Sequence, residues 1–202
     1  MTAAARSVHP IEVRSYEILR SRVDLSALPP LTRAVVERVV HASADLDYVT
    51  DLVCDEDALA AAAAALAAGA PVVADVAMVA AGITAREVVC RLPDAGALAA
   101  QAAITRSAAA VRLAAEQVGD GAVWVVGCAP TALEELLRLA ADGLRPALVI
   151  GLPVGFVGAA EAKAALRASG LPAVSNVLEK GGSAVAAAAC NALLYAGPVG
   201  DA

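Results

Sequence analysis

Aromatic side chains are scarce in this sequence, which has one phenylalanine, one tryptophan and three tyrosines among 202 residues. Few rings are therefore present on which nucleic-acid bases could stack. Basic residues are outnumbered by acidic ones, 15 against 21, which gives a net charge of −6. Because this charge opposes approach to phosphate backbones and anionic membranes, binding to nucleic acid or to a membrane surface is disfavoured.

Motifs for metals and nucleotide cofactors are missing as well. The cysteines form no CxxC pair, and neither histidine belongs to an HExxH sequence, so no dedicated metal site is expected. Segment 151–158, GLPVGFVG, lacks the GK[ST] ending of a phosphate-binding loop, and no GxGxxG follows the first predicted strand. We therefore expect no cofactor. The cysteines are interpreted as buried thiols of a reducing compartment: Cys54, Cys90, Cys128 and Cys190.

Segments suited to a membrane or to export are also lacking. The longest uncharged run, 181–200, is dominated by small residues and contains Ser183, Asn191 and Pro198, which favours a buried helix over a membrane span. Residues 1–8 have no long apolar core like that of a signal peptide, and no periodic pattern. We expect an irregular N-terminal end and a cytoplasmic protein.

Small apolar residues dominate what is present. The chain is 59% hydrophobic, and much of that fraction is alanine. The core should therefore consist of closely packed helices and strands filled by Ala, Val and Leu. A length of 202 residues suits a single domain, 1–202, with a substantial core.

Short β-branched runs alternate with helical stretches along most of the chain. Strands are predicted at 71–75, 86–92, 122–126, 147–150 and 172–177, and helices at 57–68, 95–118, 130–142, 158–169 and 182–195. This alternation implies right-handed crossovers and a parallel sheet. The predicted fold class is α/β, with a mainly parallel sheet, helices on both faces and two preceding N-terminal helices.

The two N-terminal helices are predicted from prolines suited to their first turns and from apolar residues at helical spacing. The first runs from Pro10 to about Val23, and the second lies within 31–48. On the second helix His41 belongs to the polar face, beside Arg38. Such a histidine is either a solvated surface residue or an acid–base group, and the helix pattern leaves both open.

Three loops follow predicted parallel strands at one edge of the sheet, where α/β proteins usually bind ligands. They are 127–131, 151–158 and 178–183, and each leads into a predicted helix. Their backbone N–H groups could face several anionic groups, although glycine and proline also make tight turns without any ligand. Arg106, in the nearly uncharged run 95–111, needs an anionic partner, either a ligand or an internal acid such as Asp75.

Six segments, taken in order, resemble the precorrin-8X methylmutases of corrin-ring biosynthesis, and they span nearly the whole chain. They are 9–48 (HPIEVRSYEILRSRVDLSALPPLTRAVVERVVHASADLDY), 74–83 (ADVAMVAAGI), 105–110 (TRSAAA), 129–133 (APTAL), 151–163 (GLPVGFVGAAEAK) and 179–193 (EKGGSAVAAAACNAL). The resemblance implies an isomerase that moves a methyl group from carbon 11 to carbon 12 of precorrin-8X, or of its cobalt form, without a cofactor. The product would be hydrogenobyrinic or cobyrinic acid.

The same resemblance implies roles for individual residues. His41 matches the catalytic histidine, and Arg14, Ser15 and Arg38 match substrate-contacting positions. With the three loops, the expected substrate-binding residues are Arg14, Ser15, Arg38, Asp75, Arg106, Thr131, Gly155, Lys180 and Ser183. Cys128 departs from the family, which usually has asparagine before APTAL, and this puts a direct polar contact there in doubt.

The family also implies a homodimer with the corrinoid at or near the subunit boundary. An alternative from a different class is a non-catalytic tetrapyrrole-binding carrier, which would keep the loops for anionic groups but would not need His41. A nucleotide-dependent enzyme is a weaker alternative, because the glycine fingerprint is missing.

Overall fold

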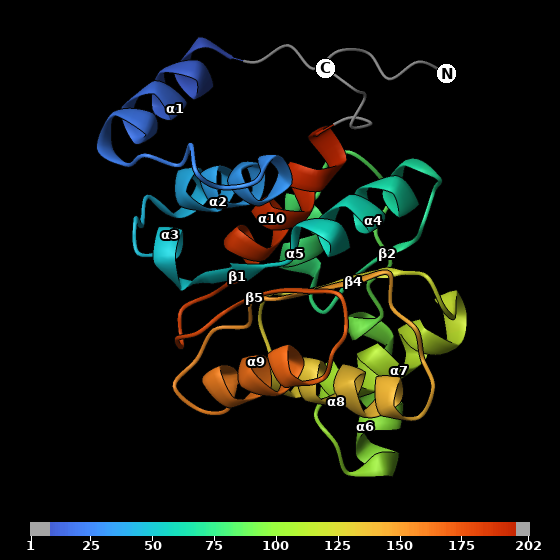
Figure 1. Ribbon diagram of the computed structural model, residues 1–202. Coiled ribbons are helices and arrows are strands. Elements are labelled where there is room, and N and C mark those ends of the chain that lie inside the picture. The colour runs from blue at the N-terminus through green and yellow to red at the C-terminus, as the bar shows by residue number, and fades with distance from the viewer. Residues whose placement is uncertain (1–8, 197–202) are drawn as a thin grey trace.

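The computed structural model describes residues 9–196 as a sheet between two layers of helices (Figure 1). The helices are α1 (Pro10–Arg22), α2 (Pro30–Ser43), α3 (Tyr48–Asp51), α4 (Glu56–Ala67), α5 (Ala77–Gly82), the short 3-10 turn η1 (Leu92–Asp94), α6 (Gly96–Ala102), α7 (Arg106–Val118), α8 (Pro130–Ala141), α9 (Ala159–Ala168) and α10 (Ser183–Tyr195). The strands are β1 (Leu52–Cys54), β2 (Val72–Ala74), β3 (Val123–Val126), β4 (Leu148–Gly151) and β5 (Ala173–Asn176).

The five strands form one sheet in the order β1-β5-β4-β3-β2. The four strands β2 to β5 are parallel, and β1 pairs with β5 in the antiparallel direction. The predicted mainly parallel α/β sheet is therefore confirmed, and so are the strands at 71–75, 122–126, 147–150 and 172–177. Because β3, β4 and β5 run the same way, the three loops that follow them lie at one edge.

Alternate residues of each strand face opposite layers, as the pleat requires. On β3, Val123 and Val125 join the core under α2, α4 and α10, whereas Trp124 and Val126 join the core over α7, α8 and α9. All four residues are at most 1% exposed. The sheet thus separates two apolar cores, and helices cover both faces (Figure 1).

Small residues let the layers approach closely, as the composition predicted. A Cβ on Gly82 of α5 would lie 2.7 Å from the Cβ of Ala187, and one on Gly127 would lie 2.7 Å from the Cβ of Ala186. Both alanines belong to α10, which is buried along most of its length. The predicted helix at 182–195 is confirmed as this buried helix.

Two predicted elements are wrong. Segment 86–92 contributes only an isolated bridge, Val73 to Val89. The side chain of Arg86 donates to the carbonyl of Leu66, in the last turn of α4, and to that of Ala70 beyond it, and η1 begins already at Leu92. The predicted helix 95–118 is broken into α6 and α7, since Ala103 adopts left-handed backbone with φ 52°.

Other expectations fall partly outside the described residues. The irregular end predicted for 1–8 and the last part of the run 181–200 belong to segments whose structure is not described. Within 9–196, none of the helices has the length and apolar character needed to cross a membrane.

Candidate active site

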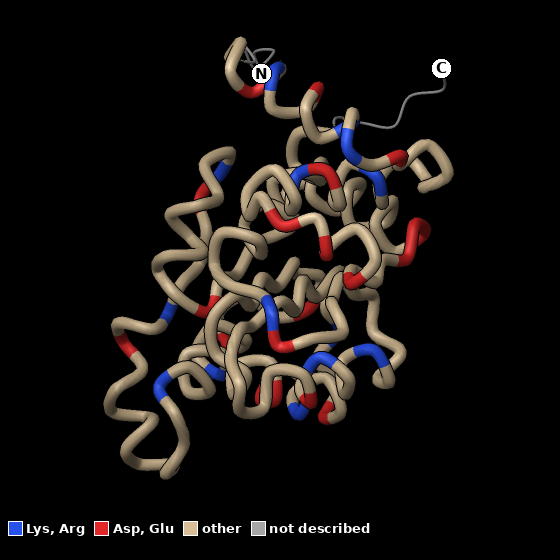
Figure 2. Tube along the Cα trace, turned by 90° about the vertical axis from the view of Figure 1, so that its left-hand side faces the viewer, with Lys and Arg blue, Asp and Glu red and all other residues tan. Residues whose placement is uncertain are grey.

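Helix α1 lies on α2 mainly through polar contacts, since Leu19 is its buried residue. Blue and red segments lie side by side on these N-terminal helices in Figure 2. Arg20 donates two hydrogen bonds to the carboxylate of Glu37, at 2.7 and 2.8 Å, and Arg38 reaches Glu12 at 3.3 Å. These ion pairs set the position of α1 relative to His41.

His41 is held by two residues of α1. Its Nδ1 lies 2.8 Å from Ser15 Oγ, and its ring stacks on Tyr16 with a centroid distance of 4.9 Å and an interplanar angle of 20°. Because Ser15 engages Nδ1, Nε2 is the nitrogen left for a ligand. The predicted polar-face position is confirmed, and the ring is half-buried instead of solvated.

Two cavities meet at His41. The smaller, of about 120 Å³, is lined by Ser15, Ile18, Leu19, Arg22, Val40, His41, Ala44 and Leu46. The larger, of about 370 Å³, is lined by Arg38, His41, Ala42, Met78, Gly82, Ser183, Ala184, Ala187, Ala188 and Asn191. The structure therefore brings together Ser15, Arg38, His41 and Ser183 from α1, α2 and α10.

Arg38 supplies a positive charge to the larger cavity. Its guanidinium lies over the ring of Tyr195, 5.1 Å from the centroid, and its side chain is only 19% exposed. An arginine held between an aromatic face and one carboxylate, that of Glu12, keeps N–H donors for a second anionic group. A ligand carboxylate is a suitable partner.

Asp75 is not the ion-pair partner of Arg106, which was the alternative to a ligand left open for that arginine. Its buried carboxylate accepts from the backbone N–H groups of Gly127, Cys128 and Ala129, at 3.1, 2.8 and 3.1 Å. Burial raises the pKa of Asp75, and these three hydrogen bonds oppose the rise. The amides of the loop after β3 are thus used by an internal acid and do not face a ligand anion.

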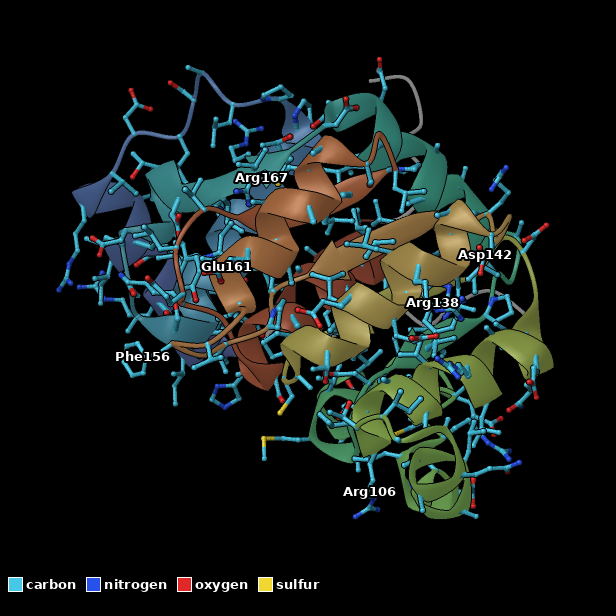
Figure 3. All side chains as sticks on the ribbon, turned by 90° about the horizontal axis from the view of Figure 1, so that it is seen from below. Arg106, Arg138, Asp142, Phe156, Glu161 and Arg167 are labelled. Atoms are coloured by element: carbon cyan, nitrogen blue, oxygen red, sulfur yellow. The ribbon has the colours of Figure 1, made fainter. Side chains whose placement is uncertain are left out.

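Arg106 and Thr131 form a separate group on the α7 side of the sheet. Arg106 is exposed at the first position of α7, donates to the Leu92 carbonyl at 3.2 Å, and lies on the outer surface in Figure 3. Thr131, in the first turn of α8, bonds to Thr105 at 2.8 Å. The premise that Arg106 sits inside a long apolar helix is wrong, because the helix begins there.

The remaining predicted binding residues lie outside the His41 cavities. Arg14 is exposed and pairs with Glu17, and Gly155 occupies the loop after β4 with φ 151°. The ammonium of Lys180 contacts Asp45 at 2.8 Å and also Asp47, and both hydrogen bonds raise the pKa of Lys180. A ligand would have to displace these carboxylates to bind it.

The interpretation of all four cysteines as buried thiols is confirmed for Cys190 alone, because Cys54 and Cys90 are partly buried and Cys128 is exposed. Burial of its sulfur and the negative charge of Asp75 raise the pKa of the Cys128 thiol. The thiol is thus kept protonated near neutrality, which does not suit a nucleophile.

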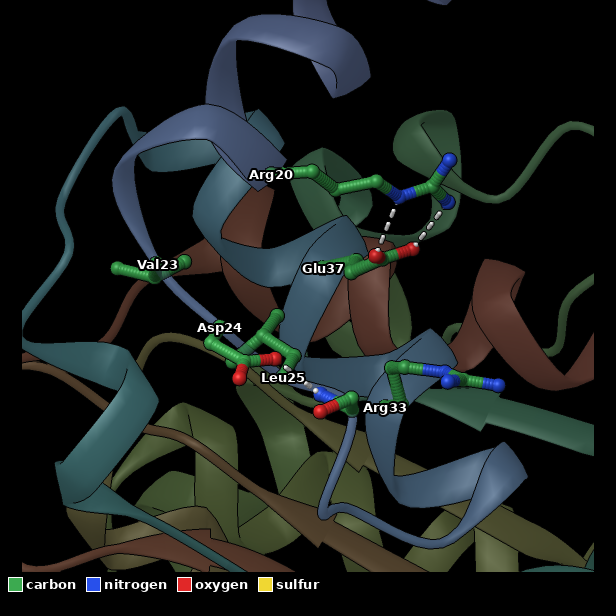
Figure 4. Close-up of a pocket in the computed structure, with 7 residues that line it drawn as sticks. Arg20, Val23, Asp24, Leu25, Arg33 and Glu37 are labelled. Carbon is green, nitrogen blue, oxygen red and sulfur yellow. Dashed lines mark hydrogen bonds and ion pairs between the residues drawn. The ribbon is translucent and has the colours of Figure 1, made fainter.

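A cavity of about 480 Å³ is lined by α1, α2 and the link between them (Figure 4), and it shares no lining residue with the two cavities at His41. It is lined by Arg20, Val23, Asp24, Leu25, Ser26, Arg33 and Glu37. Arg20 of α1 and Glu37 of α2 bond to each other there, so the charged groups that these two residues bring to the cavity serve to join the helices. In the described part of the chain, no three His, Cys, Asp or Glu side chains gather as metal ligands.

Sequence reasoning missed three residues at His41. Tyr16 stacks on its ring, and Met78 and Asn191 line the larger cavity. Tyr16 could have been singled out, since tyrosine is scarce and this one follows Ser15. The others reach the cavity only through the packing of α5 on α10 and of α10 on α2.

Comparisons with known proteins agree over nearly the whole chain. The family model of precorrin-8X methylmutases matches residues 10–196. The precorrin-8X methylmutase of a Sinorhizobium species is 42% identical over 203 residues, which cover 95% of this chain and 96% of that protein. The cobalt-precorrin-8 methylmutase of Methanocaldococcus jannaschii is 36% identical over 203 residues, 96% of each. The crystal structure of a precorrin-8X methyl mutase from Thermus thermophilus superimposes with a TM-score of 0.85, at 37% identity over 95% of this chain and 98% of that one.

Proposed function

The chain belongs to the precorrin-8X methylmutase family, and we propose that it moves the methyl group on carbon 11 of precorrin-8X, or of its cobalt form, to carbon 12. Membership makes it an enzyme of the isomerase class in cobalamin biosynthesis. The product of the proposed reaction is hydrogenobyrinic acid, or cobyrinic acid with cobalt. The observation that carries the proposal is His41, held by Ser15 at 2.8 Å where two cavities meet.

His41 acts as general acid in the proposed mechanism. The imidazolium donates Nδ1–H to Ser15 and Nε2–H to the nitrogen of ring C, which makes the neighbouring carbons electron-poor. The bond between the methyl group and carbon 11 breaks as the bond to carbon 12 forms, and the proton then returns to His41. No atom is gained or lost and no electron leaves, so the step needs no redox partner and no methyl donor.

The proposed substrate contacts follow the charges near His41. Arg38 binds a peripheral carboxylate at the larger cavity, and Ser183 adds a hydroxyl donor at its wall. Ser15 serves mainly by orienting His41. The roles of Arg14, Asp75, Arg106, Thr131, Gly155 and Lys180 in binding stay predictions.

Conversion of precorrin-8X by the purified protein tests the reaction. With no cofactor added, the absorption of the chromophore should change as the methyl group migrates. His41→Asn should lower turnover by roughly 10²–10⁴-fold, the usual contribution of a general acid.

His9→Asn is the matched control, since the chain has two histidines. His9 caps α1 by accepting from the Ile11 amide, and asparagine is also a good N-cap, so this variant should retain full turnover. If His41→Asn converted the substrate within a few-fold of the parent, the assignment of His41 would be wrong. Binding without conversion by the parent protein would instead indicate a tetrapyrrole carrier.

We also propose a homodimer in which both subunits contribute to each site. The larger cavity, about 370 Å³, holds only part of a tetrapyrrole. Helix α7, which begins with Arg106, lies on the other side of the sheet from α2, which carries His41. Phe156 and Val157, after β4, are 97% and 87% exposed and offer apolar surface for a second copy (Figure 3).

A single domain and a cytoplasmic location also stay predictions. The four free thiols fit the cytoplasmic location, because that compartment is reducing.

Mixing two impaired variants tests the shared site when precorrin-8X is held well below KM, where loss of a binding residue also lowers the rate. His41→Asn and Arg106→Met, mixed after subunit exchange, should regain about a quarter of parent activity, because half of the dimers then hold one intact site of two. Each variant exchanged with itself is the control. A mixture as inactive as its components, or an active monomer in sedimentation, would contradict the shared site.

A further inference from the structure

Lys163 of α9 is fully buried, although lysine is rarely so placed unless it is paired. Its ammonium group donates to Asn176 Oδ1 at 2.9 Å, to the Lys180 carbonyl at 2.7 Å and to the Leu178 carbonyl. Three N–H donors thus meet three acceptors. Two of the acceptors are backbone carbonyls of the loop between β5 and α10, so the ammonium group gathers that loop around itself.

Asp51, the last residue of α3, holds the same loop from another side. Its buried carboxylate accepts from the amides of Val177 and Leu178, at 2.8 and 3.1 Å, and from Asn176 Nδ2 at 2.7 Å. The fully buried amide of Asn176 therefore bridges the positive and the negative group. Because both charges are removed from water, each depends on this set of partners, which favours a single loop geometry.

The loop held in this way borders the candidate active site. A Cβ on Gly181 would lie 2.3 Å from the Leu152 carbonyl oxygen, and the amide of Gly182 donates to that carbonyl at 2.9 Å. Ser183 follows as the first residue of α10 and lines the larger cavity with His41. A shift of the loop would therefore move the cavity wall.

We propose that Lys163 is a positioning residue: its ammonium group fixes the β5–α10 loop, which in turn places Ser183 at the wall of the His41 cavity. The inference rests on the proposed function for its kinetic consequence, whereas the loop itself can be followed without substrate. His41 and Ser15 belong to α2 and α1, outside this network. Substrate binding should therefore depend on Lys163 more than the chemical step does.

Hydrogen exchange in the ligand-free protein tests the loop. Lys163→Met keeps the unbranched apolar stem of the side chain, ends one atom short and removes all three donors. The amides of Val177, Leu178 and Gly182 should therefore exchange at least tenfold faster, while those of β3 and β4 stay protected. Glu161→Gln, an exposed change on the same helix, is the matched control. Unchanged loop exchange, or equal loss of protection throughout the sheet, would overturn the proposal.

Kinetics separate a positioning role from a merely structural one. In Lys163→Met, KM for precorrin-8X should rise roughly tenfold to hundredfold, as expected when the hydrogen bond from Ser183 to a charged group of the substrate is lost, with kcat within a few-fold of the parent. A fall in kcat with unchanged KM would overturn the assignment.

A second variant covers the case in which Lys163→Met does not fold. Asp51→Asn keeps the size of the side chain but removes the countercharge, and it should accelerate exchange of the same loop amides. Unchanged exchange in that variant would count against the network. If the parent converts no precorrin-8X, the proposed function fails, while the exchange results still decide whether Lys163 fixes the loop.

Discussion

Lys163 also determines how stability should vary with pH. Burial lowers its pKa to about 8, while the charges of Asp51 and Glu179 oppose this shift and that of Arg167 adds to it. In the unfolded chain the lysine pKa is about 10.4. Between these pH values the unfolded chain holds a proton that the native protein has released, so the free energy of unfolding gains a contribution that rises with pH.

Comparison with Lys163→Met isolates this contribution. From pH 7 to pH 10.5, the free energy of unfolding of the parent should rise by up to about 3 kcal/mol relative to the variant. Burial raises the pKa of Cys54 and Cys190 to about 12, which lowers stability as pH rises above the ordinary thiol range, but both proteins share that effect. Urea unfolding at several pH values provides the measurement, and a constant difference would show that Lys163 has no lowered pKa.

Asp75, which follows β2, should contribute to stability through its hydrogen bonds to the loop after β3. Asp75→Asn replaces one acceptor oxygen with an N–H₂ group that faces backbone N–H donors, so the free energy of unfolding should fall by about 1–3 kcal/mol. Asp142→Asn, at a carboxylate that is 65% exposed, should change it by less than about 0.5 kcal/mol. Urea unfolding of both variants checks the pair, and equal effects would mean that the three N–H groups find other acceptors.

The break between α6 and α7 yields a prediction at the scale of an element. Ala103 has φ 52° and ψ 41°, a left-handed conformation that costs an L-residue about 1–2 kcal/mol and glycine nothing. Glycine also loses more conformational entropy on folding than alanine, which offsets part of the relieved strain. Ala103→Gly should therefore raise the free energy of unfolding by a net amount of roughly 0.5–1 kcal/mol. Ala100→Gly, exposed inside α6, should lower it by about the same amount. A loss of stability in both variants, measured in urea, would argue against the left-handed residue.

That same break shows why part of the fold could not be predicted from the sequence. The central strands were predictable because their β-branched runs are buried on both faces. The end of α6 was not, because alanine stands where glycine usually marks a helix end, although Thr105 before α7 is an ordinary N-cap. Strand β1 has only three residues and depends on β5, more than a hundred positions away.

The candidate site divides in the same way. His41 and its polar face could be predicted from helical periodicity, because that pattern is local. The use of the 127–129 amides by Asp75 could not, because it joins residues 52 to 54 positions apart through the packing of β2 beside β3. The partners of Lys180, Asp45 and Asp47, are likewise 135 and 133 positions away in the sequence.

At the scale of the whole molecule, two cores share one sheet and should unfold together. Trp124 of β3 is the single tryptophan and belongs to the core on the α7 side, whereas helices on both sides contribute to circular dichroism. Urea transitions followed by Trp124 fluorescence and by circular dichroism at 222 nm should therefore coincide. A fluorescence transition that precedes the other would show that the two layers unfold separately and that 1–202 is not one cooperative domain.

Both borders of the sheet are short or covered. At one border β1 has three residues, and at the other β2 exchanges hydrogen bonds with Val89, whose amide donates to Val72 and whose carbonyl accepts from Ala74. A free strand edge is a template on which another chain can add its own strand. Because little of the valine-rich sheet is open in this way, native molecules have few places at which to begin intermolecular β-pairing, and aggregation of this alanine- and valine-rich protein should require prior loss of β1 or of the Val89 segment.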